Sequence, residues 1–175
     1  MKKDNKSYGA RRIALLSLTV AFALMLSYIE SLLPAFVPLP GVKIGLANVA
    51  VVFVMFTLGA ADALTVSLIR VLLVSMLFGS PVSAFYSILG AVFSFGAMLF
   101  LSKIPAFSLI GISVAGGVFH NIGQIIAAAA VLGGTEVLAY LPVLIASGTA
   151  AGIAVGAVSS LLIIKLKRHI WALIS

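Results

Sequence analysis

Polar side chains with the chemistry to bind a ligand lie inside long apolar runs of this chain. His120, Asn121 and Gln124 occur together in HNIGQ, and a spacing of four places His120 and Gln124 on one face of a helix. Arg70 lies near the middle of another apolar run, where an unpaired charge costs at least ~2.5 kcal/mol in a bilayer. Each of these groups therefore needs a partner, which is either protein, water or a bound solute.

Two interpretations of the HNIGQ cluster stay open, namely hydrogen bonding between helices and solute binding. Gly116 and Gly117, just before it, leave space for a close helix or for a ligand. One histidine beside two amides is a poor set of metal ligands, so we expect no metal site. Asn48 adds another amide in an apolar run, with packing and binding again both open.

Arg70 also has two interpretations. Glu30 lies near the end of the first apolar run, and a long arginine side chain can extend toward such a group. An Arg70–Glu30 ion pair would fix helix packing. Alternatively, Arg70 binds an anionic or polar solute.

Catalytic and cofactor motifs are missing from the sequence. The acidic residues lie far apart, so they form neither a paired-carboxylate site nor an Asp-rich magnesium motif; they are Asp4, Glu30, Asp62 and Glu136. The sequence has no Walker loop, and the absence of cysteine excludes disulfides, thiolate metal sites and cysteine nucleophiles. We therefore expect a protein that is not an enzyme and uses no cofactor.

The elements that must position these side chains are membrane helices. Hydrophobic residues make up 63% of the 175 residues, charged residues 9%, and the mean hydropathy is +1.30, which is far from the balance of soluble domains. The runs are apolar on every face, unlike the alternating strands of a membrane barrel. We predict an all-α membrane protein with one domain, 1–175. The six expected transmembrane helices cover residues 13–33, 44–58, 60–78, 84–101, 109–132 and 138–165.

Basic residues predict the orientation. They precede the first span, follow the last, or lie between the fourth and fifth, at Lys2, Lys3, Lys6, Arg11, Arg12, Lys103, Lys165, Lys167 and Arg168; the other side has only Lys43. Because cytoplasmic loops carry the excess of Lys and Arg, both termini should be cytoplasmic, with a basic segment at 1–12, a six-helix bundle at 13–165 and a tail at 166–175. Anionic lipids of the cell membrane explain the net charge of +7 better than nucleic acid.

Two further patterns concern loops and packing. Residues 34–43 contain three prolines and a glycine, which predicts a semi-rigid extended segment that is either a plain connector or a lid over a cavity and that presents Lys43. Gly148, Gly152 and Gly156 recur every four residues, as in closely packed membrane helices. They favour internal packing, with a subunit-docking face as the alternative.

A family resemblance is carried by two stretches, PGVKIGLANVAVVFVMFTLGAADALTVSLIRVLLVSMLFGS and, downstream, HNIGQIIAAA. They resemble the small bacterial membrane family called Gx transporters, also labelled heptaprenyl diphosphate synthase component I. The family is similar to the S components of energy-coupling factor transporters. Those proteins have six helices and a solute pocket open to the outside, and they dock on a transmembrane T subunit that is driven by two ATPases.

The resemblance implies roles for particular residues. The pocket would be lined or supported by Lys43, Asn48, Arg70, His120, Asn121 and Gln124. Ala23 and Ser27 of the first helix would meet the T subunit, with Ser27 replacing the second alanine of the Ala-x-x-x-Ala pattern that is common in S components.

Two functions follow from these expectations. The first is the solute-binding subunit of an ATP-driven importer for an anionic or aromatic small molecule. The second is a non-catalytic membrane partner, component I, of a heptaprenyl diphosphate synthase or a quinone-precursor pathway. Arg70, His120 and Gln124 at membrane depth favour the first, because a simple anchor has no need of them.

Overall fold

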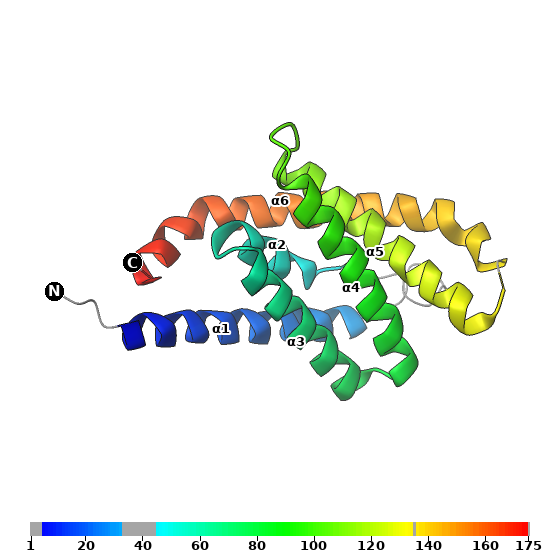
Figure 1. Ribbon diagram of the computed structural model, residues 1–175, viewed down its shortest axis with the longest axis horizontal. Coiled ribbons are helices and arrows are strands. Elements are labelled where there is room, and N and C mark those ends of the chain that lie inside the picture. Colours follow the sequence, from blue (N-terminus) through cyan, green and yellow to red (C-terminus); the bar gives the residue numbers. More distant parts are fainter. Residues whose placement is uncertain (1–4, 33–44, 135, 175) are drawn as a thin grey trace.

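The computed structural model describes residues 5–32, 45–134 and 136–174, and within these ranges every regular element is a helix (Figure 1). The elements are α1 (Asn5–Leu32), α2 (Asn48–Thr57), α3 (Ala60–Phe78), α4 (Pro81–Leu101), α5 (Leu109–Leu132), the short 3₁₀ helix η1 (Glu136–Tyr140) and α6 (Leu141–Ile174). The predicted all-α fold is confirmed for the described part of the chain.

Five helices are long and apolar enough to cross a membrane, namely α1, α3, α4, α5 and α6. Large apolar side chains on their outer faces are exposed, among them Leu18, Met76 and Ile164, which are 68%, 83% and 75% exposed. An apolar surface of this extent is suited to lipid and not to water. The chain thus has the features of a multi-pass membrane protein.

The second element differs from its predicted span of 44–58. With ten residues, α2 is about 15 Å long, which is half the roughly 30 Å thickness of the hydrocarbon core. Most of α2 is buried, and Val52 and Val54 are almost inaccessible to solvent. It ends at a turn formed by Leu58 and Gly59, where Gly59 has a φ of 119°. A helix that is apolar on all faces therefore lies inside the bundle here.

The first helix begins, and the last helix ends, at the same end of the bundle (Figure 1). In Figure 1, α1 and α6 run in opposite directions, and the start of α1 lies at the same end of the molecule as the end of α6. We refer to this as the terminal end of the bundle. The arrangement agrees with two termini on one side of the membrane, and their cytoplasmic location stays a prediction.

Backbone contact between α5 and α6 explains the glycine pattern. A Cβ atom added at Gly117 would lie 2.3 Å from the carbonyl oxygen of Gly148, and one added at Gly152 would lie 2.5 Å from Cα of Val114. A Cβ at Gly156 would likewise meet α5, at 2.9 Å from Cα of Ile110. These distances are too short for any side chain, so the internal-packing interpretation of the three α6 glycines is confirmed.

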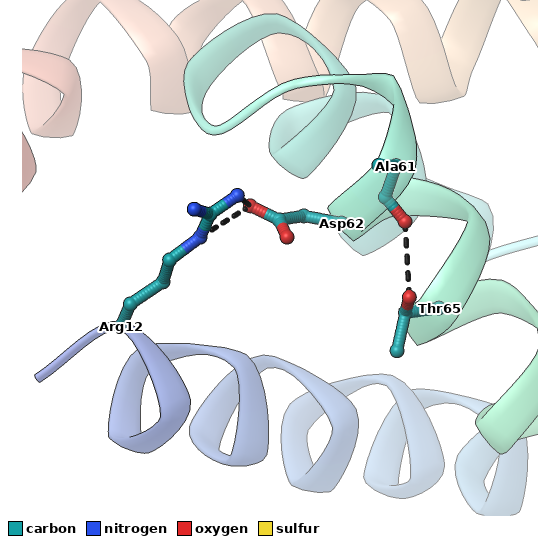
Figure 2. Close-up of polar contacts among 4 residues, drawn as sticks. All are labelled: Arg12, Ala61, Asp62 and Thr65. Carbon is teal, nitrogen blue, oxygen red and sulfur yellow. Dashed lines mark hydrogen bonds and ion pairs between the residues drawn. The ribbon is translucent and has the colours of Figure 1, made fainter. Parts of the chain in front are cut away.

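An ion pair joins α1 to α3 near the terminal end (Figure 2). The Arg12 guanidinium donates to Oδ2 of Asp62 from Nη2 at 2.7 Å and from Nε at 3.1 Å. Asp62 lies in the first turn of α3, where the helix dipole also favours a negative charge. The sequence had suggested an Arg70–Glu30 pair as one possibility and had assigned Asp62 no partner.

This ion pair should make a small contribution to stability. The Arg12 side chain is 43% exposed, and pairs of this kind contribute about 0.2–1 kcal/mol. We expect Asp62→Asn and Arg12→Gln each to lower the free energy of unfolding in detergent by about 1 kcal/mol or less. The double variant should lose less than the sum of the two single losses, and strict additivity would contradict a direct interaction.

Candidate functional site

A cavity lies between the helices and is lined by residues from all six α-helices. Its volume is about 80 Å³, whereas one water molecule needs roughly 10–15 Å³ by the same measure. The cavity thus has room for several waters or for one small solute. Its lining mixes the charged side chains Glu30 and Arg70 with amides, serines and glycines, which is unusual for an interior surrounded by lipid.

Arg70 reaches this cavity from the middle of α3. Its Nη2 atom donates a hydrogen bond to Oδ1 of Asn48, the first residue of α2, at 3.3 Å. Its Nε atom is buried and has no hydrogen-bond partner in the described residues. The structure therefore brings the predicted residues Arg70 and Asn48 together and leaves the Nε atom of the guanidinium without a partner in the described residues.

Glu30 lines the same cavity from α1, but it does not pair with Arg70. Its Oε1 atom accepts a hydrogen bond from the backbone N–H of Gly45, just before α2. Among the described residues, the ion pair that forms is Arg12–Asp62, and none joins Glu30 to Arg70. Glu30 and Arg70 therefore form no direct ion pair, although the Glu30 carboxylate is close enough to attract the Arg70 guanidinium.

The HNIGQ residues of α5 divide between packing and the cavity. Nδ2 of Asn121 donates to the carbonyl oxygen of Leu144 at 2.6 Å and to Oγ of Ser147 at 3.2 Å, so Asn121 links α5 to α6. Gln124 is 5% exposed, and its buried Oε1 atom has no partner in the described part of the chain. Gln124 is thus the member of the cluster with an unused hydrogen-bonding atom.

His120 also lines the cavity and packs closely against α4. A Cβ atom added at Gly90 would come within 2.9–3.0 Å of three atoms of the imidazole ring. The glycine therefore makes room for the ring, which lies flat against the α4 backbone. Both interpretations of the HNIGQ cluster thus apply, to different members of it.

Ala23, Ser27 and Lys43 complete the set of predicted residues. Ala23 is fully buried, and Ser27 is 9% exposed and lines the cavity. As arranged here, neither side chain offers a surface to another subunit, so the docking role stays a prediction that requires α1 to move. Lys43 and the proline-rich segment 34–43 lie outside the described residues.

Several small polar residues of the cavity wall were not predicted from the sequence. Ser113 of α5 is 3% exposed and its Oγ atom has no partner within the described ranges. Ser113, Gly117, His120 and Gln124 follow a helical spacing of three or four and form one stripe on α5. The stripe was visible in the sequence, but serine is a common residue in helix packing and carried no separate signal.

A matched pair of substitutions separates the two amides of α5. Asn121→Leu should lower the free energy of unfolding by at least about 1 kcal/mol, because it removes two hydrogen bonds between helices. Gln124→Leu should leave it unchanged or raise it, because the lost oxygen had no partner. Thermal unfolding of both variants in one detergent provides the measurement, and equal losses would show that Gln124 also serves packing.

Comparisons with known proteins complete the description. Neither the search of curated proteins nor the search of solved structures found a match to this chain. A family model described as heptaprenyl diphosphate synthase component I matches residues 19–162, a range that runs from within α1 to within α6 and includes the described residues of the cavity wall. The chain therefore belongs to the heptaprenyl diphosphate synthase component I family.

Proposed function

We propose that this chain is a non-catalytic membrane subunit that binds a small polar or anionic solute between its helices. The observation that carries the proposal is a pair of buried atoms on residues of one cavity, Nε of Arg70 and Oε1 of Gln124, that have no partner within the described ranges. A solute that accepts a hydrogen bond from the Arg70 guanidinium and donates one to Oε1 of Gln124 would give both atoms a partner.

The energetic argument is that these groups are costly without a solute. A buried polar atom without a partner costs about 1–3 kcal/mol, and a charged group costs more. A protein that served only as a membrane anchor would be more stable with apolar residues at 70 and 124. Buried ionisable residues in membrane helices are accordingly expected at functional sites.

The family description supports one setting for this subunit. As component I of a heptaprenyl diphosphate synthase, the chain would be the membrane partner of an enzyme subunit that performs the chemistry. It would contribute binding of a precursor or attachment to the membrane. Of the two settings, this one has the direct support of the family comparison.

The cavity itself favours a second setting, the substrate-binding subunit of an ATP-driven importer. The cavity includes Glu30 and Ser31, which lie at the end of α1 that is remote from the terminal end (Figure 1). With both termini in the cytoplasm, this part of the cavity would face outward and capture solute from outside the cell membrane. A transmembrane T subunit and two ATPases would then be the partners.

Co-purification from native membranes tests the two settings. The tagged chain is expected to bring with it a soluble prenyl synthase if it is component I, or a T subunit with ATPases if it is an importer subunit. Solute binding is tested separately by native mass spectrometry of the purified chain. A small adduct on the wild type that disappears in Arg70→Met supports the binding function, whereas an adduct-free wild type contradicts it.

A further inference from the structure

The unpartnered atoms of the cavity describe the chemistry of its solute. Nε of Arg70 is a donor, Oε1 of Gln124 is an acceptor, and Oγ of Ser113 is both; all three are buried and lack partners in the described residues. They belong to residues of two helices, α3 and α5, that line one cavity. A solute that satisfies them must present an acceptor to α3 and an N–H or O–H donor to α5.

We propose that the solute is a small amino or hydroxy acid. Its carboxylate accepts from the Arg70 guanidinium, and its amino or hydroxyl group donates to Oε1 of Gln124, with Ser113 able to hydrogen-bond to either end. The proposal rests on the binding function proposed above and adds the class of solute. A guanidinium is well suited to a carboxylate, because its N–H groups match the planar geometry of the two oxygens.

The charges of the wall disfavour a polyanion. Arg70 is the cation and Glu30 the anion among the described residues that line the cavity, so the formal charges of these two side chains cancel. A diphosphate would bring two or more negative charges near the Glu30 carboxylate, with one guanidinium to compensate them. A singly charged or zwitterionic acid avoids this repulsion, and an ammonium group would also be attracted by Glu30.

The volume limits the size of the solute. A cavity of about 80 Å³ is several times larger than the roughly 10–15 Å³ that one water needs, so it suits a solute with few non-hydrogen atoms. L-lactate and L-alanine, which each have about six non-hydrogen atoms, are solutes of this size. Propionate has the same carbon chain and carboxylate but no donor, which makes it the matched control.

The test measures binding of four probes to the purified full-length chain by calorimetry and by thermal shift. The probes are L-lactate, L-alanine, propionate and inorganic pyrophosphate. We expect L-lactate or L-alanine to bind at least about tenfold more tightly than propionate, because propionate leaves Oε1 of Gln124 unpaired. The comparison of L-lactate with L-alanine tells whether the donor is a hydroxyl or an ammonium group.

Two variants assign the ends of the solute. Gln124→Leu should remove the preference over propionate and leave propionate affinity nearly unchanged, whereas Arg70→Met should weaken all three carboxylates. Gly96→Ala is the control variant, since Gly96 is exposed and a Cβ there meets nothing within 4 Å.

Tighter binding of pyrophosphate, or equal binding of propionate, would overturn the proposal that the solute is an amino or hydroxy acid and would leave the proposed binding function intact. Binding of none of the four probes would also overturn the amino or hydroxy acid, and the binding function itself would then be contradicted only by a wild type that is free of adducts in native mass spectrometry.

Discussion

Arg70→Met should raise the thermal unfolding temperature of the solute-free protein while it abolishes solute binding. The substitution removes a buried guanidinium whose Nε atom has no partner among the described residues, and a buried polar group left without a partner costs about 1–3 kcal/mol, or more when it is charged. For a chain of this size, each kcal/mol corresponds to about 2–4 °C. Loss of the hydrogen bond to Asn48 reduces the gain but should not reverse it.

The matched control is Arg12→Met at the terminal end. Arg12 is an arginine of the same bundle with a carboxylate partner, Asp62, so its replacement should lower the unfolding temperature. Opposite signs for the two variants would show that Arg70 serves a ligand at the expense of stability. A fall of similar size in both would make Arg70 a packing residue and contradict the proposed binding role.

Gly152→Leu should cause a large loss of stability. A Cβ atom at this position would lie 2.5 Å from Cα of Val114 and 2.8 Å from the carbonyl oxygen of Ser113. Both are backbone atoms, so no side chain can rotate away and α5 and α6 must separate. Because overpacking alone costs about 1–3 kcal/mol, and separation also loses the close helix contact, we expect a loss of at least about 3 kcal/mol.

Gly96→Leu is the control for this prediction. Gly96 lies in the C-terminal half of α4 and is exposed, and a Cβ atom added there meets nothing within 4 Å. Leucine is also a better helix former than glycine, so this variant should unfold at or above the wild-type temperature. Chemical unfolding in mixed micelles measures both variants, and similar midpoints for the two would contradict the close contact between α5 and α6.

Long apolar runs made the later helices predictable. The span expected at 109–132 coincides with α5, and that expected at 60–78 coincides with α3, because glycine, serine and proline residues interrupt the apolar pattern at their ends. Serines precede the helices α4 and α5. The hydroxyl oxygens of Ser80 and Ser108 accept hydrogen bonds from the backbone N–H groups of Ser83 and Gly111, respectively. Local chemistry of this kind is visible in the sequence.

The short second helix was not predictable in the same way. Residues 44–58 are apolar over nearly the length of a span, yet α2 begins only at Asn48. Hydropathy measures transfer into an apolar environment and does not distinguish lipid from the interior of a bundle. The assignment of α2 as a complete span was therefore wrong in length, although the break at Gly59 was correctly located.

The candidate site was predictable in its members but not in their partners. Asn121 and Gln124 are both amides on α5 that line the cavity, and the sequence does not tell which one is hydrogen-bonded to α6 and which keeps an unpartnered atom among the described residues. Arg12 and Asp62 are separated by 50 positions, and their pairing depends on how α1 packs on α3. Only the tertiary arrangement decides such questions, because hydrogen bonding between helices depends on rotation about each helix axis.

The glycine contacts between α5 and α6 have a consequence for how a solute enters the cavity. Backbone against backbone leaves no side chains to rearrange, so this pair forms a stiff wall that local fluctuations do not open. Near the terminal end, α1 and α3 are instead joined by an ion pair whose arginine is partly exposed, and such a contact breaks and reforms readily. Exchange of solute should therefore follow displacement of α1, and amide hydrogens should exchange faster in α1 than in α5 and α6.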